Sequence, residues 1–269
     1  MLDFTNRQTE IVALARSSGR VIVEELARRF EVSPQTIRKD LNELCERRVL
    51  TRVHGGAIVA SGVENLAYEA RRFVAAEEKK TIGRAAAELI PNNCSLFINI
   101  GTTTEEVASA LVSHEDLLVI TNNLNVAMLL HRHPRIEVVV AGGSVRSSDG
   151  ALVGSTAISI IRQFKVDYAI IGTSAIDQEG ALLDFDFREV QVAQAIIENA
   201  RSVMLVADSS KLSRSAPVRI AHISQINTFV TDRLSSASLR AICQSRGIRV
   251  IETLPEGDLE RDDLPSPSK

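Results

Sequence analysis

The feature that most restricts the fold of this chain is an alternation of apolar runs and helical patterns that begins near residue 77. Seven runs have the length and the Val, Ile and Leu content of buried strands: CSLFINI, LLVIT, IEVVVAGG, VDYAIIG, SVMLVAD, TFVTD and IRVIETL. Helical patterns such as TTEEVASALVS, LNVAMLLHRH and REVQVAQAIIENA lie between them. Strands that alternate with helices of this length predict βαβ units and a mostly parallel sheet covered on both faces. Residues 77–253 are therefore predicted to form one α/β domain.

Residues 1–60 follow a different pattern, in which short helical segments precede a hairpin signal. RQTEIVALARSS and VEELARRF read as two amphipathic helices, and a third helix is predicted to open at Ser33 and Pro34. Ser33 can accept from the first free N–H groups as the N-cap, and Pro34 at the first helical position loses no donor that the helix needs.

The third predicted helix separates apolar from polar residues. At 100° per residue, Ile37, Leu41 and Leu44 fall on one side. The opposite side carries long hydrogen-bonding side chains, which is typical of the second helix of a helix-turn-helix that enters the major groove of DNA. The predicted DNA-binding residues of this segment are Ser33, Gln35, Thr36, Arg38, Lys39 and Asn42. Gln35 and Arg38 are suited to adenine and guanine, whereas Thr36 and Lys39 are better placed for phosphate.

A hairpin signal follows in RVLTRVHGGAIVA, where two β-prone runs flank His54, Gly55 and Gly56. Glycine supplies the positive φ that tight hairpin turns require. The combination predicts a winged helix-turn-helix over 1–60, with Arg52 and His54 near the DNA backbone or minor groove. The alternative is a three-helix protein-interaction module whose Arg and Lys side chains are only solvated.

Charge and composition fit a two-domain regulator. Residues 1–60 carry ten Lys and Arg against eight Asp and Glu (net +2), whereas residues 61–269 carry 21 against 26 (net −5). Residues 61–76 are expected to be a linker, and 254–269, rich in Pro, Ser and acidic residues, a flexible tail. No membrane segment or signal peptide is predicted, and Cys45, Cys94 and Cys243 lack disulfide or zinc spacing, so a cytoplasmic location is expected.

Four polar loops are predicted to follow strands of the α/β domain, where open parallel sheets bind their ligands. Glycine brings the backbone close to an anion, hydroxyl groups donate to phosphate, and a following helix adds its free N–H groups. Arg146 or Lys211 would supply the compensating charge. The predicted effector-binding residues of these loops are Gly101, Thr102, Thr103, Thr104, Thr121, Asn122, Asn123, Gly142, Gly143, Arg146 and Lys211.

The segment LDFDFREV adds two further candidates, Asp184 and Asp186. One interpretation makes them, with Glu189, an acid/base group near Lys211 for proton transfer. The favoured one is that Asp184 or Asp186 caps the next helix while Glu189 stabilises its first turn. Recognition of a ligand hydroxyl by an Asp is the second choice. No catalytic residue and no metal site is predicted, since the His residues lack metal-ligand spacing.

In these motifs the chain resembles the DeoR family of bacterial transcription regulators. SPQTIRKDLNEL and LTRVHGGA carry the resemblance in the first domain, and FINIGTTTEEVA, ITNNLNVA, AGGSVRSSDGALVG, LDFDFREV and VADSSK carry it in the second. Two departures from the family pattern are Arg48, where many members have Gly, and Ala193 with Gln194, where close relatives have Lys-Arg.

The resemblance implies a second domain similar in fold to ribose-5-phosphate isomerase and CoA transferases, with a site for a phosphorylated sugar or polyol. It implies a repressor that binds operator DNA as a homodimer or homotetramer and is released by a phosphorylated effector. Glycerol 3-phosphate is the expected effector, and no cofactor is expected. The alternative is a sugar-phosphate isomerase or transferase that carries a DNA-binding head.

Overall fold

The computed structural model of the protein describes residues 4–18, 20–47, 49–53, 55–59 and 68–253. Arg48, His54, residues 61–67 of the expected linker and the expected tail lie outside the described residues. The chain divides into two compact units, Met1–Ala76 and Glu77–Lys269, and each is described by itself.

The first unit contains the predicted helices and hairpin. Its helices are α1 (Asn6–Ser18), α2 (Val23–Arg29), α3 (Pro34–Glu46) and α4 (Tyr68–Phe73), the last within the range expected to be a linker. Its strands are β1 (Arg20–Ile22), β2 (Leu50–Val53) and β3 (Gly56–Val59), in the antiparallel order β1-β3-β2. β1 was not predicted, because three residues are too few for a periodic signal.

Gly56 is needed where β3 pairs with β1. A Cβ atom at this position would lie 1.9 Å from the carbonyl oxygen of Val21, so a side chain cannot be accommodated without moving β1. Gly55 has a φ of 74°, as the predicted hairpin turn requires. The wing therefore uses one glycine for backbone conformation and the next for close approach.

The core of the first unit joins all three helices of the helix-turn-helix. Ile37, Leu41 and Leu44 of α3 are fully buried, together with Ile11 of α1 and Leu26 of α2. The predicted apolar stripe of α3 is thus confirmed, and it leaves the opposite side of the helix in solvent.

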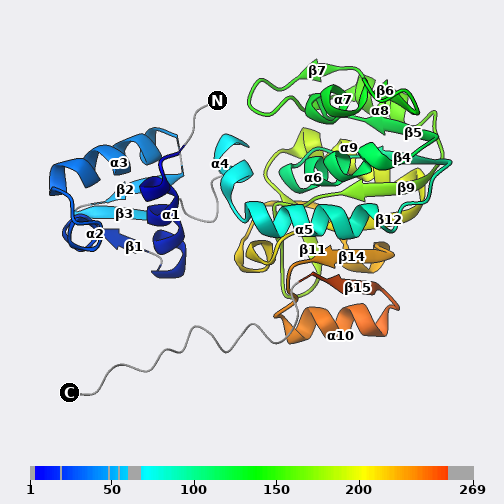
Figure 1. Cartoon of the computed structure of the whole chain (residues 1–269). Helices are drawn as coiled ribbons and strands as arrows, with labels where there is room; N and C mark the ends of the chain where they lie inside the picture. Colours follow the sequence, from blue (N-terminus) through cyan, green and yellow to red (C-terminus); the bar gives the residue numbers. More distant parts are fainter. Residues whose placement is uncertain (1–3, 19, 48, 54, 60–67, 254–269) are drawn as a thin grey trace. The chain divides into compact units, whose positions relative to one another are not determined.

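The second unit is built on a seven-stranded sheet, and each of the seven predicted runs contributes one strand (Figure 1). The order is β15-β14-β12-β9-β4-β5-β6, and every neighbouring pair is parallel. The strands are β4 (Cys94–Ile98), β5 (Leu117–Thr121), β6 (Ile136–Val140), β9 (Val166–Ile171), β12 (Ala200–Val206), β14 (Thr228–Thr231) and β15 (Arg249–Glu252).

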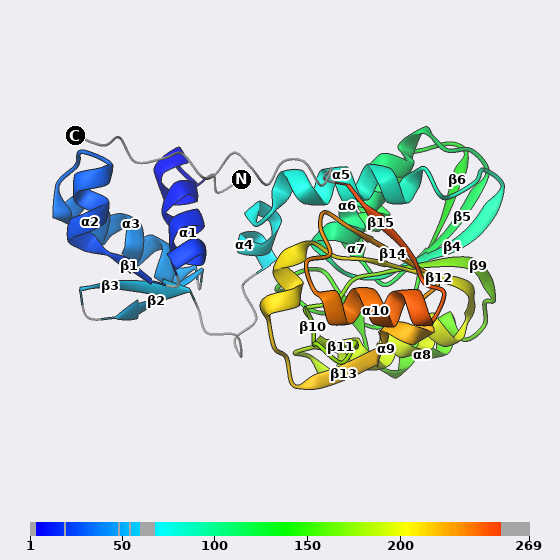
Figure 2. The same cartoon turned by 90° about the horizontal axis from the view of Figure 1, so that it is seen from below.

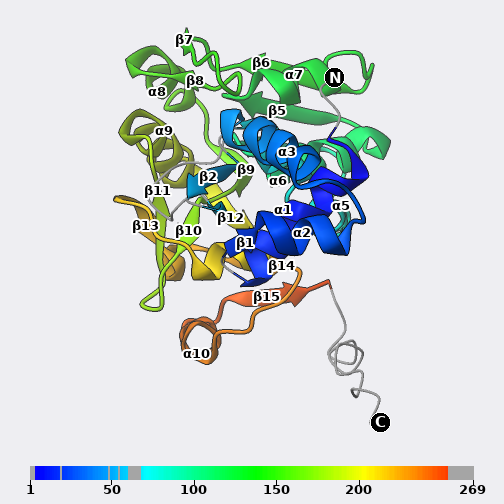
Figure 3. The same ribbon diagram turned by 90° about the vertical axis from the view of Figure 1, so that its left-hand side faces the viewer.

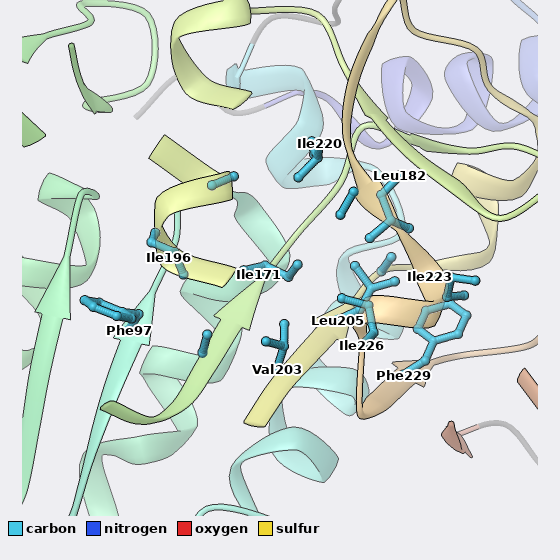
Figure 4. Close-up of a cluster of buried hydrophobic side chains, with 14 of the residues drawn as sticks. Phe97, Ile171, Leu182, Ile196, Val203, Leu205, Ile220, Ile223, Ile226 and Phe229 are labelled. Carbon is cyan, nitrogen blue, oxygen red and sulfur yellow. The ribbon is translucent and has the colours of Figure 1, made fainter. Parts of the chain in front are cut away.

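Helices cover both faces of this sheet (Figure 2). α5 (Ala76–Ala87), α6 (Thr102–Ala110) and α7 (Leu124–Leu130) lie on one face, and α8 (Ser155–Ile161), α9 (Phe187–Glu198) and α10 (Ala237–Ser245) on the other. Neighbouring strand residues alternate between the two cores, since Leu96 and Ile98 join the first and Phe97 the second. Figure 4 shows Phe97 with Ile171, Leu205 and Phe229 in the larger cluster.

Short antiparallel strands outside the main sheet were not predicted. β7 (Ser144–Val145) pairs with β8 (Leu152–Val153), and β10 (Ala175–Ile176), β11 (Ala181–Asp184) and β13 (Val218–His222) form a small sheet in the order β10-β11-β13. This small sheet packs against α9 through β11 and β13 (Figure 3). The 3-10 helices are η1 (Leu111–Ser113), η2 (Ser209–Ser213) and η3 (Ile223–Gln225).

Candidate functional site

The polar side of α3 carries exposed hydrogen-bonding side chains, as expected for a helix that enters a DNA groove. Ser33 caps the helix, and its hydroxyl accepts a hydrogen bond from the backbone N–H of Thr36 at 3.1 Å. Gln35, Arg38, Lys39 and Asn42 are all exposed, and Arg38 donates to Gln35 at 3.4 Å. Together with residues of α1 they line a hollow of about 950 Å³. The side chains that sequence reasoning assigned to DNA thus share one solvent-facing surface.

Two polar contacts beneath this surface hold α3 against α1, and sequence reasoning did not identify them. Arg7 donates to the buried carboxylate of Asp40 at 2.6 Å, and Gln8 donates to Glu43 at 2.7 Å. The hydrogen bond to Asp40 raises the pKa of Arg7. These pairs fix the rotation of α3 relative to α1 and so hold the exposed residues of α3 in a defined direction.

The wing adds Arg52, which is exposed on β2 beside the hairpin turn. His54, the other predicted wing residue, lies outside the described residues.

In the second unit, one predicted loop lies where the strand order of the sheet reverses. β4 and β9 are neighbours, but β5, which follows β4, lies on one side of the pair, and β12, the next strand of this sheet after β9, lies on the other. Ligands of open α/β sheets bind outside the carboxyl ends of strands at such a point. The loop Gly101–Thr104 follows β4, and Gly172, Thr173 and Ser174 follow β9. The second group was missed because Gly-Thr-Ser alone is a common turn sequence.

In the loop after β4, backbone N–H groups are better placed than side-chain hydroxyl groups to donate to a ligand. Gly101 has a φ of 143° and is the N-cap of α6 without a side-chain cap. The Thr104 hydroxyl donates to the carbonyl oxygens of Asn99 (2.8 Å) and Gly101 (2.7 Å), so its proton is already used. Thr103 is buried and Thr102 is half-buried. The first-turn N–H groups of α6 are therefore the donors best suited to an anion here.

Glu105 joins this loop to the next one. One of its carboxylate oxygens, Oε1, accepts from the amide of Asn123 and from the amide of Asn125, both at 3.0 Å. Asn123 in turn caps α7, and the Thr121 hydroxyl donates to the carbonyl of Ile98 at 2.7 Å. Glu105 lies in the first turn of α6, and its side chain also sets the orientation of the Asn123 side-chain amide.

Asn122 is fully buried, and its side-chain oxygen has no hydrogen-bond partner among the described residues. Its amide nitrogen donates to the Leu152 carbonyl at 3.4 Å. A buried amide oxygen without a partner is costly in a folded protein.

Gly142 and Gly143 have φ values of 66° and 104° and pack against α8. A Cβ atom at Gly143 would lie 2.8 Å from the Val153 carbonyl oxygen. These contacts give both glycines a packing role between β6 and α8, and none of them joins the two glycines to the other three loops.

Arg146 is held by three carboxylates. Its guanidinium donates to Asp149 (2.6 and 2.8 Å), Asp186 (2.9 Å) and Glu189 (2.6 Å), which ties the segment after β7 to the start of α9. Burial alone would lower the pKa of Arg146, but the hydrogen bonds and charges of Asp149 and Glu189 raise it. These contacts already balance its charge, so Arg146 acts here as a clamp between two segments.

Asp186 is the N-cap of α9 and accepts from the Arg188 N–H at 2.8 Å, and Glu189 lies in the first turn. The favoured interpretation of this segment is therefore confirmed for Asp186. The hydrogen bond from the Arg188 side chain, together with Arg146, lowers the pKa of Asp186. Asp184 is buried and accepts from the Ser174 hydroxyl at 3.1 Å, which places it beside the loop that follows β9.

The loop after β12 contains a buried charge cluster. Asp208 caps η2, and its oxygen Oδ2 is buried without a hydrogen-bond partner among the described residues. Burial opposes ionisation of Asp208, but the charges of Lys211 and Lys79 lower its pKa overall. Lys211 is 7 % exposed and Lys79, on α5, only 2 %. Sequence reasoning missed Lys79, although its spacing from Ile82 and Ala86 on the apolar side of α5 was an available signal.

None of the helices in the described residues has the length and apolarity needed to cross a membrane. No group of His, Cys, Asp or Glu in that part of the chain has the arrangement of a metal site.

Comparison with known proteins identifies both units. Residues 7–63 match the model of a DeoR-like helix-turn-helix domain, and residues 74–233 match the DeoR C terminal sensor domain. The glycerol-3-phosphate regulon repressor of Escherichia coli (strain K12) is 44 % identical over 91 % of this chain and 98 % of its own length. The repressor of the same name from Haemophilus influenzae is 47 % identical over 84 % of this chain and 88 % of its own.

A third relative is the HTH-type transcriptional repressor CsqR of Escherichia coli (strain K12), 41 % identical over 94 % of this chain and 96 % of its own. Among solved structures, ribose 5 phosphate isomerase A from Neisseria gonorrhoeae matches with a TM-score of 0.39 and 16 % identity, over 51 % of this chain and 54 % of that one. At this TM-score the match carries no functional inference.

Proposed function

The chain belongs to the DeoR family, and from this premise we propose that it is a DNA-binding transcriptional repressor whose second unit senses a phosphorylated metabolite. The observation that carries the proposal is the exposed polar side of α3, fixed against α1 by Arg7 and Asp40, in a chain that also contains a sensor domain. The relatives from Escherichia coli and Haemophilus influenzae, which are glycerol-3-phosphate regulon repressors, support repression as the sign of regulation.

The effector proposed is glycerol 3-phosphate, and the site comprises the loops after β4, β5, β9 and β12. The free N–H groups at the start of α6 and the cations Lys211 and Lys79 suit a phosphate group. Asp184 and Asp208 suit the hydroxyl groups of a polyol, because a carboxylate accepts hydrogen bonds from hydroxyl groups. Arg146 is not part of the phosphate site in this proposal, since three carboxylates hold it.

Effector binding releases DNA by linkage, because the effector has different affinities for the conformations with high and low DNA affinity. The repressor acts in the cytoplasm as a homodimer or homotetramer on an operator with two-fold symmetry. No enzymatic activity is part of the proposal.

A gel-shift titration with operator DNA tests the effector. Glycerol 3-phosphate is expected to release the DNA, whereas glycerol is not. Lys211→Ala should leave DNA affinity unchanged and raise the effector concentration for half-release at least about tenfold, or ~1.4 kcal/mol. Lys165→Ala, which removes an exposed lysine of the same unit, is the matched control. Binding that no sugar or polyol phosphate alters would refute the proposed effector site.

The enzyme alternative has its own test. A sugar-phosphate isomerase would turn over a panel of phosphosugars, and the rate would fall on Asp184→Asn or Lys211→Ala. We expect no turnover by the full chain above that of a buffer blank.

A further inference from the structure

The main sheet of the sensor unit ends in two strands that each pair on one side only. β6 lies at one end and β15 at the other (Figure 1). Within the described part of the chain, β5 is the only strand that pairs with β6. An unpaired strand edge exposes N–H and C=O groups that can pair with another chain.

The hydrogen bonds at the two ends of β6 establish which of its residues face outward. The Arg135 carbonyl accepts from Leu117 N–H, and Ala141 N–H donates to Thr121, so residues of odd number direct their backbone groups toward β5. Ile136, Val138 and Val140 must then direct theirs away from the sheet, because successive residues of a strand alternate. Only the N–H of Ile136 has a local partner, the His133 carbonyl.

The edge of β6 is partly apolar, and Glu137 is the one charged residue of the strand. Val140 is 39 % exposed, and α7, which packs on β6, carries Met128 at 67 % and Leu129 at 40 % exposed. Ile136 and Val138 belong to the core on the α7 side, so the side chain of Val140 lies on that side too, whereas Glu137 lies on the other. Apart from Glu137, β6 lacks the features that usually prevent edge pairing, such as Lys, Pro or a bulge.

We propose that two copies of this chain associate through β6, which pairs antiparallel with β6 of the second copy about a two-fold axis at Val138. The geometry is self-complementary. Val138 forms a hydrogen-bonded pair with the partner's Val138. Ile136 lies opposite the partner's Val140 and its carbonyl can accept from that N–H, while its own N–H stays with the His133 carbonyl. Every outward-facing residue therefore meets another outward-facing residue. Glu137 lies opposite the partner's Val139, so no like charges are directly opposed.

A second copy is the occupant that these observations favour. A two-fold axis through one strand needs no other sequence, whereas a different partner would need a matching free edge of its own. The two copies of α7 would lie on the same side of the continued sheet, where Met128 and Leu129 lose exposed apolar surface. The surface shares no residue with the proposed effector loops, so the proposed function does not depend on it.

Val138→Pro tests the pairing with little change to the subunit. Proline removes an N–H group that points out of the sheet, a position where edge strands tolerate it. The matched control is Val250→Pro on β15, whose N–H also points outward, since Arg249 and Thr253 direct theirs to β14. Light scattering after gel filtration measures the mass of the full chain.

We expect Val138→Pro to halve the mass of the wild-type assembly and Val250→Pro to leave it unchanged. A monomeric wild-type chain, or a Val138→Pro protein with the wild-type mass, would overturn the proposal. If Val138→Pro does not fold by circular dichroism, Val140→Lys introduces a charge at the same edge without changing the backbone and should halve the mass in its place.

Glu137→Gln gives a result in the opposite direction. The two Glu137 side chains would lie diagonally across the axis, where like charges repel. The substitution should therefore lower the dissociation constant of the dimer, measured by sedimentation at low salt. An unchanged or higher dissociation constant contradicts the register about Val138.

Discussion

At the scale of single residues, the two units use arginine in opposite ways. Arg38 is exposed on α3 with only a long contact to Gln35, so its guanidinium remains available to a base edge. Arg146 has 15 % of its side chain exposed and donates to three carboxylates. The neighbourhood that the fold supplies, and not the residue type, decides which arginine contacts a ligand and which one joins two segments.

Arg38→Ala is expected to weaken binding to the operator by about 1–3 kcal/mol while binding to unrelated DNA changes little, because a bidentate contact to a base is lost. Lys39→Ala should instead weaken both and reduce the salt dependence by about one unit, as expected for a phosphate contact. Gel shifts at several salt concentrations separate the two effects. Equal losses on operator and unrelated DNA from Arg38→Ala would exclude base reading by Arg38.

Arg146→Met is expected to lower the free energy of unfolding of the sensor unit by about 3–5 kcal/mol at pH 7, because it leaves largely buried carboxylates without a counter-charge. Arg188→Met, which removes an exposed partner of Asp186, should cost much less, because solvent screens that ion pair. Urea denaturation gives both values. Similar losses for the two variants would rule out a clamp at Arg146.

The same cluster predicts a pH dependence. The pKa of Asp186 is lower in the folded protein than in the unfolded chain. Its contribution is therefore complete above the unfolded pKa of about 4 and is lost as pH falls through the folded value. The difference between Arg146→Met and the wild type should shrink below pH 5, because Asp186 loses its contact with Arg146 in the variant and is protonated there at a higher pH. A difference that grows with acidity would contradict this account.

At the scale of elements, the proposed sensor site depends on contacts between loops as much as on the loops themselves. Glu105 of α6 orients the amides of Asn123 and Asn125, which lie at the start of α7. The order of β4 and β9 then adds Gly172, Thr173 and Ser174, a loop with no individual sequence signal. The site is therefore a property of strand order and of buried polar contacts between neighbouring loops.

Glu105→Ala is expected to raise the effector concentration needed for DNA release by about tenfold, since two amides lose the acceptor that orients them, at about 1–3 kcal/mol. Affinity for the operator without effector should stay the same. Glu106→Ala, at the next position of α6, serves as the control. Titration calorimetry with glycerol 3-phosphate measures the change, and wild-type affinity in Glu105→Ala would remove Glu105 from the site.

At the scale of the whole molecule, the division into two units separates DNA binding from sensing. Glycerol 3-phosphate at 100 times its dissociation constant should stabilise the sensor unit by about 2.7 kcal/mol and raise its melting temperature. Lys211→Ala should show little of this shift in a thermal scan of the full chain. A shift of equal size in that variant would place the effector elsewhere.

The sequence by itself determined the elements that periodicity and capping encode. The helices α1, α2 and α3 and the hairpin of the first unit, the cap at Ser33 and the seven strands of the second unit all follow from local patterns, whereas α4 lies where a linker was expected. The short strands β1, β7, β8 and β10 could not be predicted, because two or three residues carry no period.

Only the tertiary structure decided which residues meet. The hydrogen bonds of Arg146 to Asp186 and of Glu105 to Asn123 join segments 40 and 18 residues apart, and no local pattern specifies such pairs. The burial of Lys79 beneath the sensor unit's surface and the free edge of β6 likewise follow from strand order and helix packing. The physical reason is that side-chain periodicity defines the inner face of an element, whereas its neighbours depend on how all the elements pack together.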